Sequence, residues 1–426
     1  MSASSVPRAL FFVLFFAFAI AGLAGCSRDA AAPAAHPAGA EPVTASFYGT
    51  PFERHPDAAE LTSLGRSLFS EPALSRSGAL SCASCHSPAH AYGPPNDLSV
   101  QLGGADLERF GVRAVPSLMY AQDTPPFSEH FNDTDGDDSV DQGPTGGRDW
   151  DGRASSAHEQ ASGPLLSPFE MGNADAAQVI ARLQQAPTAD AFRTAFGPRV
   201  FDDPKIAWNG LLLALEVFQQ SPADFYPYSS KYDAFLRGKA RLSAAERRGL
   251  ALFNDAGKAN CLQCHSGAVK RGAFPQFTDR GFIAIGVPRN ASIPANADPA
   301  YFDLGLCGPL RADLEDHPEY CGLFKTPTLR NVARRGAFFH NGVFHRLEDV
   351  VRFYAERDVH PGKFYPRGKD HAVQKFDDLP GQYRGNLNDE APFDRKPGDT
   401  PVLTEAQIRD LVSFLGTLDD GYRAEP

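Results

Sequence analysis

The pattern Cys-x-x-Cys-His occurs twice in this chain, at residues 82–86 and again at residues 261–265. It is the attachment signature of a c-type haem, in which two thiols bind the macrocycle and the next imidazole ligates the iron. A zinc ribbon would place its cysteine pairs closer together, and a thioredoxin-like pair would not need the histidine. The sequence therefore predicts two covalently bound haem c groups. The predicted attachment residues are Cys82, Cys85, Cys261 and Cys264, and the predicted iron ligands are His86 and His265.

Residues 1–25 have the pattern of an export signal. Arg8 provides a positive charge, and the apolar run that follows is too short to span a bilayer. The end of this segment, Leu23–Cys26, resembles a bacterial lipobox in which Cys26 becomes the lipidated N-terminus; ordinary signal cleavage with an incidental Cys26 is the alternative. We expect a periplasmic protein anchored to the membrane by lipid on Cys26, with the Ala- and Pro-rich residues 26–44 as a tether.

Two cysteines remain once Cys26 and the four haem cysteines are set aside, namely Cys307 and Cys321. An oxidising compartment would pair them in a disulfide that closes a short loop, and two buried free thiols are the alternative. The formal charge of −11 argues against nucleic acid as a partner.

Helix signals surround both haem motifs. Residues 57–69 have helical spacing and lead into the first motif, a capping box at Ser243 opens a helix before the second, and Thr404 caps a helix near the end of the chain. The apolar residues 206–218 predict a further helix, which we expect to bridge the two halves. The sequence thus predicts a mainly α fold with two cytochrome c-like domains, each around one covalent haem and wrapped by long loops. The predicted domains are residues 45–238 and 239–426.

Methionine is scarce, which limits the ligands available to the irons. Simple electron-transfer cytochromes often use Met as the second axial ligand. This chain has only Met1, Met119 and Met171, so the second haem cannot take a Met ligand from its own domain.

Three longer motifs resemble those of the bacterial dihaem cytochrome c peroxidases and the MauG-like enzymes, over residues 61–418. The first is Asp149–Ala154, continued by Glu159-Gln160, Gly163–Leu165 and Pro168–Met171; the second is Phe324–Asn331, continued by Phe339–Gly342 and Leu347–Val351; the third is Ile285–Pro288. The resemblance implies a peroxidatic haem in the N-terminal domain and an electron-transfer haem in the C-terminal domain.

The resemblance also implies roles for individual residues. Gln160 and Glu170 match the distal pocket of the first haem, with Pro164 beside them, and Trp150 matches the tryptophan between the haems. A carboxylate can move a proton between the oxygens of peroxide, and an indole can relay an electron. From the residues alone, Glu170 would be read as a surface or capping carboxylate and Trp150 as a packed core residue.

Tyr354, 14 residues after His340, stands where the peroxidases carry a Met ligand of the second haem and MauG carries Tyr. The resemblance implies a phenolate ligand there, which would favour the oxidised states of the iron. A buried core tyrosine is the alternative, and His340, His345 and His360 are the competing ligands.

Two features depart from the family pattern. Residues 87–113 offer only His90 as a further ligand of the first iron, and it lies close to the motif, so we expect an open, five-coordinate iron. The family's interdomain calcium usually uses an Asn where this chain has Ala114, although carbonyls of Arg335 and Ala337 could still hold calcium. The acidic loop Asp133–Asp138 has its glycine out of register with the EF-hand pattern, and we interpret it as a solvated loop.

Three functions follow from these motifs. The first is a dihaem c-type peroxidase that reduces hydrogen peroxide at the N-terminal haem, with electrons that a small cytochrome c or cupredoxin delivers through the C-terminal haem. The second is a MauG-like oxidase that uses peroxide to modify residues of a partner protein. The third is a plain electron-transfer protein, which would need both irons six-coordinate.

Overall fold

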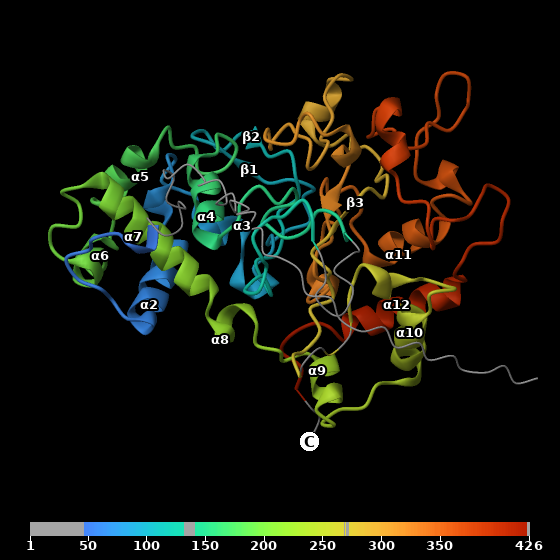
Figure 1. Ribbon diagram of the computed structural model, residues 1–426, viewed down its shortest axis with the longest axis horizontal. Coiled ribbons are helices and arrows are strands. Elements are labelled where there is room, and N and C mark those ends of the chain that lie inside the picture. Colours follow the sequence, from blue (N-terminus) through green and yellow to red (C-terminus); the bar gives the residue numbers. More distant parts are fainter. Residues whose placement is uncertain (1–46, 132–140, 268, 270–271, 424–426) are drawn as a thin grey trace, which may run out of the picture. The chain divides into compact units, whose positions relative to one another are not determined.

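The computed structural model describes residues 47–131, 141–267, 269 and 272–423, and they form a mainly helical fold with a few short strands (Figure 1). Residues Thr50–Pro426 make up one compact unit. The predicted signal peptide, Cys26, the tether and the acidic loop Asp133–Asp138 lie outside the described residues. Within the described ranges, every helix is too short or too polar to cross a bilayer.

A first group of helices packs around α7. Its members are α2 (Ala58–Phe69), α4 (Ala157–Leu166), α5 (Ala176–Leu183), α6 (Ala189–Phe196) and α7 (Pro204–Gln219). The α2 helix begins as predicted, because Asp57 and Glu60 form a reciprocal capping box. The α7 helix packs against α2, α4 and α5, so it is a core helix of this group rather than the expected bridge (Figure 1).

A second group contains α10 (Ala244–Asn254), α11 (Leu347–Glu356) and α12 (Glu405–Gly416), in which α12 packs against both others (Figure 1). The capping boxes at Ser243 and Thr404 are both present, which confirms the predicted helix starts. The rings of Phe253, Phe277 and Phe414 meet at the centre of this group, with centroids 5.3 to 6.4 Å apart. The shorter helices α3 (Cys82–Cys85), α8 (Pro222–Phe225) and α9 (Lys231–Leu236) complete the helical segments discussed below.

The same close helix contact occurs in both groups. A Cβ added to Gly65 of α2 would lie 2.0 Å from the carbonyl oxygen of Ala214 in α7. A Cβ added to Gly249 of α10 would lie 2.1 Å from the carbonyl oxygen of Asp410 in α12. Glycine therefore sets the approach of the two helices in each pair.

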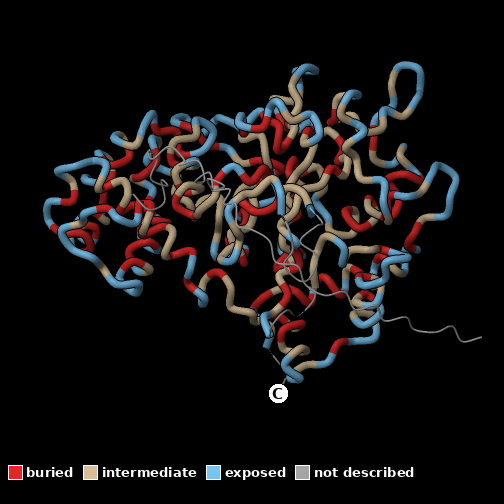
Figure 2. The backbone as a smooth tube through the Cα atoms, in the orientation of Figure 1, coloured by how far each residue is buried: buried red, intermediate tan, exposed pale blue. Residues whose placement is uncertain are grey.

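The strands are short and serve to fix loops. Leu102–Gly103 (β1) pairs antiparallel with Arg109–Phe110 (β2), and Phe282–Ile283 (β3) pairs antiparallel with Phe324–Lys325 (β4). The disulfide between Cys307 and Cys321 is present, as predicted, and closes one of the long loops. Buried residues occur in these loops as well as in the helices, so the loops are part of the packed interior (Figure 2).

Candidate functional site

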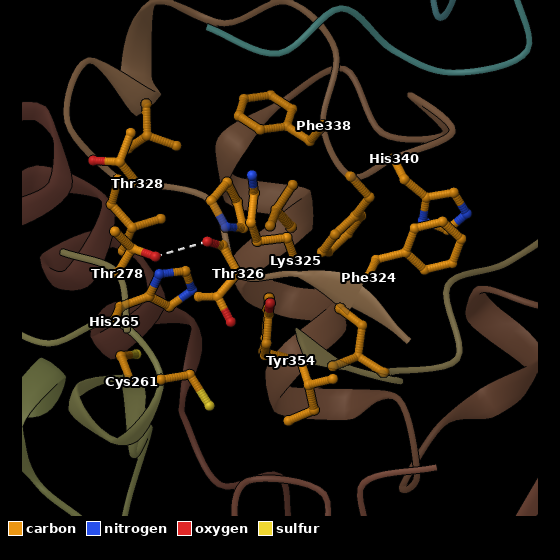
Figure 3. A pocket seen from close by; sticks show the side chains of 18 of the residues that line it. Cys261, His265, Thr278, Phe324, Lys325, Thr326, Thr328, Phe338, His340 and Tyr354 are labelled. Atoms are coloured by element: carbon orange, nitrogen blue, oxygen red, sulfur yellow. Dashed lines mark hydrogen bonds between the residues drawn. The ribbon is translucent and has the colours of Figure 1, made fainter. Parts of the chain in front are cut away.

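A largely apolar cavity lies beside the second haem motif (Figure 3). Cys261, Cys264 and His265 line it together with side chains from α10, α11 and α12. The apolar part of the lining includes Phe253, Val350, Val351, Leu403, Leu411 and Leu415. Such a lining suits a large apolar ring and leaves the imidazole as a polar ligand on one side.

His265 is held in the form that ligates iron. Its Nδ1 donates to the carbonyl oxygen of Phe277 at 3.1 Å, which leaves Nε2 as the ring nitrogen that would ligate iron. Burial lowers the pKa of His265 to about 4, so the imidazole is neutral at physiological pH. A neutral imidazole with a fixed Nδ1–H is the arrangement that metal-ligating histidines show.

His86 repeats this arrangement at the end of α3. Its Nδ1 donates to the carbonyl oxygen of Tyr92 at 3.0 Å, and burial lowers the pKa of His86 to about 4. Tyr92 is fixed in turn by its ring, whose centroid lies 4.1 Å from that of Phe225. Both predicted iron ligands therefore present Nε2 for coordination.

The four predicted attachment cysteines form no disulfide. Burial raises the pKa of Cys82, Cys261 and Cys264 to about 12 and that of Cys85 to about 11, so the thiols are uncharged at neutral pH. Each pair, followed by a neutral imidazole, fits a covalently attached haem c in its donor set.

Tyr354 projects from α11 into the cavity near Cys261 and His265 (Figure 3). Its ring stacks on Phe393 with centroids 5.4 Å apart. Burial raises the pKa of Tyr354, and the neighbouring Cys264 and Cys261 add to this effect. Without an iron, the phenol would therefore stay protonated at neutral pH.

Of the three competing histidines, His345 and His360 do not line this cavity. His340 lines the same cavity but stacks flat on Phe324, with centroids 3.5 Å apart (Figure 3). His345 Nδ1 donates to the Gly336 carbonyl, and His360 pairs with Glu356 at 2.7 Å. His340 is thus the only one of the three histidines that, in the described part of the chain, lines the cavity with Tyr354.

Trp150 lines the cavity and is fixed at two points. Its indole Nε1 donates to the carbonyl oxygen of Ala114 at 2.7 Å, and its own carbonyl accepts from the Lys325 N–H of β4 at 2.9 Å. Only 8% of the residue is exposed. The residue is therefore bound through its indole to a segment that follows the first haem motif, and through its backbone to one that follows the second.

Gln160 and Pro164 lie on α4. Gln160 lines the cavity, and its Nε2 donates to Asp149 at 3.3 Å. Pro164 has no N–H for the carbonyl of Gln160, so the helical bond between these residues is absent. The carbonyl of Pro164 accepts from the Met171 N–H at 3.1 Å, which folds the next turn back onto the helix.

Glu170 lies on that turn, whose backbone is fixed by the Gly104 N–H donating to the Glu170 carbonyl at 2.7 Å. Its side chain keeps exposed surface, yet protein surrounds it closely enough for desolvation to raise its pKa, against the effect of a hydrogen bond from Ser167. After burial, the charge of Glu170 is the second cause that raises the pKa of Cys85, so the carboxyl lies near the first haem motif.

Sequence reasoning missed two charged residues around Trp150. The Arg113 guanidinium is buried and binds Asp303 at 2.6 and 2.7 Å and Asp151 at 2.6 Å. Lys325 donates from Nζ to the Gly147 carbonyl at 2.6 Å, and burial lowers the pKa of Lys325 to about 7. Lys325 belongs to a motif that the sequence analysis noted, but nothing local to Arg113 indicates a partner 190 residues away.

No group of three or more His, Cys, Asp and Glu side chains within the described ranges is arranged to hold a metal ion. The carbonyl of Ala114 is the acceptor of the Trp150 indole, and Arg335 donates to the carbonyl of Val115 at 3.0 Å. Calcium stays an untested prediction.

Known proteins resemble this chain over most of its length. Residues 59–241 match the family model described as di-haem cytochrome c peroxidase. The methylamine utilization protein MauG of Paracoccus denitrificans is 34% identical over 396 residues, which are 89% of this chain and 93% of that protein. The cytochrome c551 peroxidase of Pseudomonas aeruginosa is 28% identical over 305 residues, which are 71% of this chain and 73% of that protein. The crystal structure of the diheme peroxidase BthA from Burkholderia thailandensis superposes with a TM-score of 0.76 at 39% identity, covering 86% of this chain and 87% of that one. This chain therefore belongs to the dihaem cytochrome c peroxidase and MauG family of oxidoreductases.

Proposed function

We propose that this protein is a dihaem c-type peroxidase that reduces hydrogen peroxide at the haem of Cys82, Cys85 and His86. Electrons enter through the haem of Cys261, Cys264 and His265, from a small cytochrome c or cupredoxin. The observation that carries the proposal is that Glu170 is exposed and that its carboxyl lies close enough to Cys85 of the first haem motif for its charge to raise the pKa of that thiol. On the sequence alone, we also propose that the protein is a periplasmic lipoprotein.

When bound, the haems supply the redox chemistry of peroxide reduction. The chain supplies proton transfer and positioning. Glu170 takes a proton from one peroxide oxygen and returns it to the other, which lets the O–O bond break to give water. Its raised pKa brings the carboxyl closer to the pH at which it both accepts and gives a proton.

Gln160 and Trp150 have separate roles in the proposed reaction. Gln160 is oriented by Asp149 and can donate to or accept from a bound oxygen or water. Trp150 provides the route for electrons between the two sites, because its indole is fixed by the carbonyl of Ala114 and its backbone carbonyl by the N–H of Lys325.

The first test replaces Glu170 with Gln. We expect peroxide turnover to fall by about 10²–10⁴-fold, since an amide cannot shuttle the proton. Glu108→Gln, at an exposed position of the β1–β2 loop, is the matched control and should leave turnover unchanged. A Glu170→Gln variant as active as the control would contradict the assignment.

The MauG-like oxidase is the second candidate function, and Tyr354 favours it. A phenolate on the second iron would stabilise oxidised states and let that site store oxidising equivalents for use on a partner protein. The test is the redox potential of the second haem in the wild type, Tyr354→Phe and Tyr354→Met. We expect both variants to raise the potential, because a neutral ligand or none stabilises the reduced iron better than an anionic oxygen.

Equal potentials in all three proteins would make Tyr354 a core residue, and His340, which lines the same cavity, would be the next candidate. Electron paramagnetic resonance of the resting ferric protein tests the electron-transfer alternative. We expect a high-spin signal from the first haem. Two low-spin haems would instead favour the plain electron conduit.

A further inference from the structure

Three tyrosine rings contact one another in succession, from Tyr120 in the cavity lining through Tyr228 to the partly exposed Tyr226. Tyr120 is 1% exposed and lines the cavity together with Trp150 and His265. Its ring centroid lies 5.1 Å from that of Tyr228, and the Tyr228 ring lies 6.5 Å from that of Tyr226. Tyr226 is partly exposed, and its hydroxyl donates to the carbonyl of Gln220 at 2.5 Å.

The hydroxyl of Tyr120 has a carboxylate ready to take its proton. It donates to Asp420 at 2.8 Å and 2.9 Å to the two carboxylate oxygens. Asp420 is itself held by Ser229 and by Asn331, whose Nδ2 donates to it at 2.7 Å. Burial raises the pKa of Tyr120, so the phenol keeps its proton at neutral pH. An electron can therefore leave Tyr120 together with a short proton movement to Asp420, which leaves a neutral ring radical.

The neighbouring charge does not prevent this step. The Arg330 guanidinium lies 4.5 Å from the Tyr120 ring centroid and 4.8 Å from that of Tyr228, where its charge would oppose a positively charged ring. It is neutralised by Asp233, which binds it at two points of 3.0 Å. Because the Tyr120 proton moves to Asp420, the oxidised ring also carries no net charge.

The Tyr228 ring contacts the rings of both Tyr120 and Tyr226. Its hydroxyl accepts from Nε2 of Gln276 at 2.6 Å and of Gln122 at 3.2 Å. Among the described residues, the Oε1 atoms of both glutamines are buried without a hydrogen-bond partner. Either amide can therefore rotate so that its oxygen accepts from the Tyr228 hydroxyl. The two side chains that hydrogen-bond to this phenol are thus uncharged.

We propose that Tyr120, Tyr228 and Tyr226 form a relay that carries an oxidising equivalent from the cavity to the surface at Tyr226, where it oxidises a phenolic or indole side chain of a partner protein. The proposal rests on the proposed function, because peroxide is the oxidant. Hydrogen peroxide takes up two electrons and two protons to give two waters. One electron comes from Tyr120, the other from the small cytochrome c or cupredoxin of the proposed function, and solvent supplies the two protons.

The remaining steps balance in the same way. Tyr120 passes its proton to Asp420 and is then reduced by an electron from Tyr226, through Tyr228, while Asp420 returns the proton. Tyr226 loses its own proton to solvent. The partner's phenol or indole then gives one electron, with a proton from solvent or from its own ring, and becomes a radical itself.

The experiment maps where the radical reaches the surface. Peroxide is added to the holoprotein in the presence of a nitrone spin trap, and the trapped positions are located by mass spectrometry of the peptides. We expect an adduct at Tyr226 in the wild type and its loss in Tyr120→Phe and Tyr228→Phe. Tyr320→Phe is the matched control, because Tyr320 is partly exposed and stacks on His317 away from the relay; this variant should keep the Tyr226 adduct.

The outcomes separate the relay from the proposed function. If the wild type consumes peroxide but shows no adduct at Tyr226, or if both Phe variants keep it at the wild-type yield, the relay is wrong while the peroxidase proposal stands. If the wild type consumes no peroxide, the proposed function fails and the relay with it. Should a Phe variant not fold, electron paramagnetic resonance of the wild type grown on ring-deuterated tyrosine decides. A peroxide-induced signal that narrows on deuteration supports the relay, and one that does not narrow overturns it.

Discussion

Removing one partner of the buried ion pair between Arg330 and Asp233 should be among the most destabilising single substitutions in this fold. Both side chains are 0% exposed, and two hydrogen bonds of 3.0 Å join them. Arg330 also donates from Nε to the carbonyl of Pro275 at 2.9 Å. In Asp233→Asn the guanidinium stays buried without its counter-charge, and removing one partner of such a pair costs about 3–5 kcal/mol. Asn can still accept from the Ser230 N–H at the start of α9, so the change tests the charge rather than the helix cap.

The assay is urea unfolding followed by circular dichroism, with the free energy of unfolding compared between variants of equal m-value. Asp410→Asn is the matched control. Asp410 also binds an arginine at two points, with both bonds at 2.7 Å, but its partner Arg248 is 61% exposed. An exposed pair contributes about 0–1 kcal/mol, so the control should unfold close to the wild type. Equal losses of stability in the two variants would refute the reasoning.

Acid should reduce the loss of stability that Asp233→Asn causes. Burial opposes ionisation of Asp233, but the hydrogen bonds and charge of Arg330 and the bonds from Ser230 outweigh it and hold the pKa below its ordinary value. The pair's contribution is therefore complete above the unfolded-state pKa of about 3.9 and is lost as the pH falls through the lower folded-state pKa. The difference in stability between wild type and Asp233→Asn should shrink only in that acidic range. Replacing both residues by apolar ones should recover most of the lost stability, since no unpaired charge then remains.

Three further outcomes are expected. Gly65→Ala should lower the free energy of unfolding by about 1–3 kcal/mol, because the added Cβ would meet the Ala214 carbonyl. Gly416→Ala is the control in the same urea titration and should be neutral or slightly stabilising, because an added Cβ would have nothing within 4 Å. Replacing Cys307 and Cys321 together by Ser should cost about 3 kcal/mol, the loop-closure value for a loop of about 15 residues. Added reductant should destabilise the wild type by a similar amount and leave the double variant unchanged. Because surrounding protein raises the pKa of Glu170, peroxide turnover should fall on acidification at a pH above the ordinary carboxyl range, and a pH–rate profile of Glu170→Gln should lack that limb.

The helices could be predicted where their signals are local. Ser243 and Thr404 lie within one turn of the residues that they cap, so the starts of α10 and α12 could be predicted from neighbouring residues alone. The helices that pack against α7 could not be predicted in this way. Its apolar residues show that it is buried, but the choice of α2, α4 and α5 depends on contacts such as that between Gly65 and Ala214, which no local pattern encodes.

The residues of the site likewise fall into those that local sequence predicts and those that it does not. The haem motifs are contiguous, so the sequence predicts six residues of the two sites together, and the structure adds the backbone carbonyls of Tyr92 and Phe277 that orient the histidines. Those carbonyls could not be predicted, because a carbonyl acceptor leaves no trace in residue type. The partners of Arg113 were missed for another reason, since Asp303 lies 190 residues away and both are common surface residue types.

Trp150 shows how these non-local contacts bear on the proposed electron route. The residue after it, Asp151, binds Arg113 at 2.6 Å, and the same guanidinium binds Asp303 in a loop that follows the second haem motif. The indole itself donates to the carbonyl of Ala114, the neighbour of Arg113. A backbone carbonyl is present whatever residue stands at position 114, so the lack of an Asn there does not loosen the indole. Asp151, the neighbour of Trp150, is thus joined to the loop of Asp303 by a buried cation that belongs to the chain itself. If electrons take the proposed route through Trp150, the ion pairs of Arg113 with Asp151 and Asp303 help to fix its backbone there, and this contribution should not change with the free metal ions in the medium.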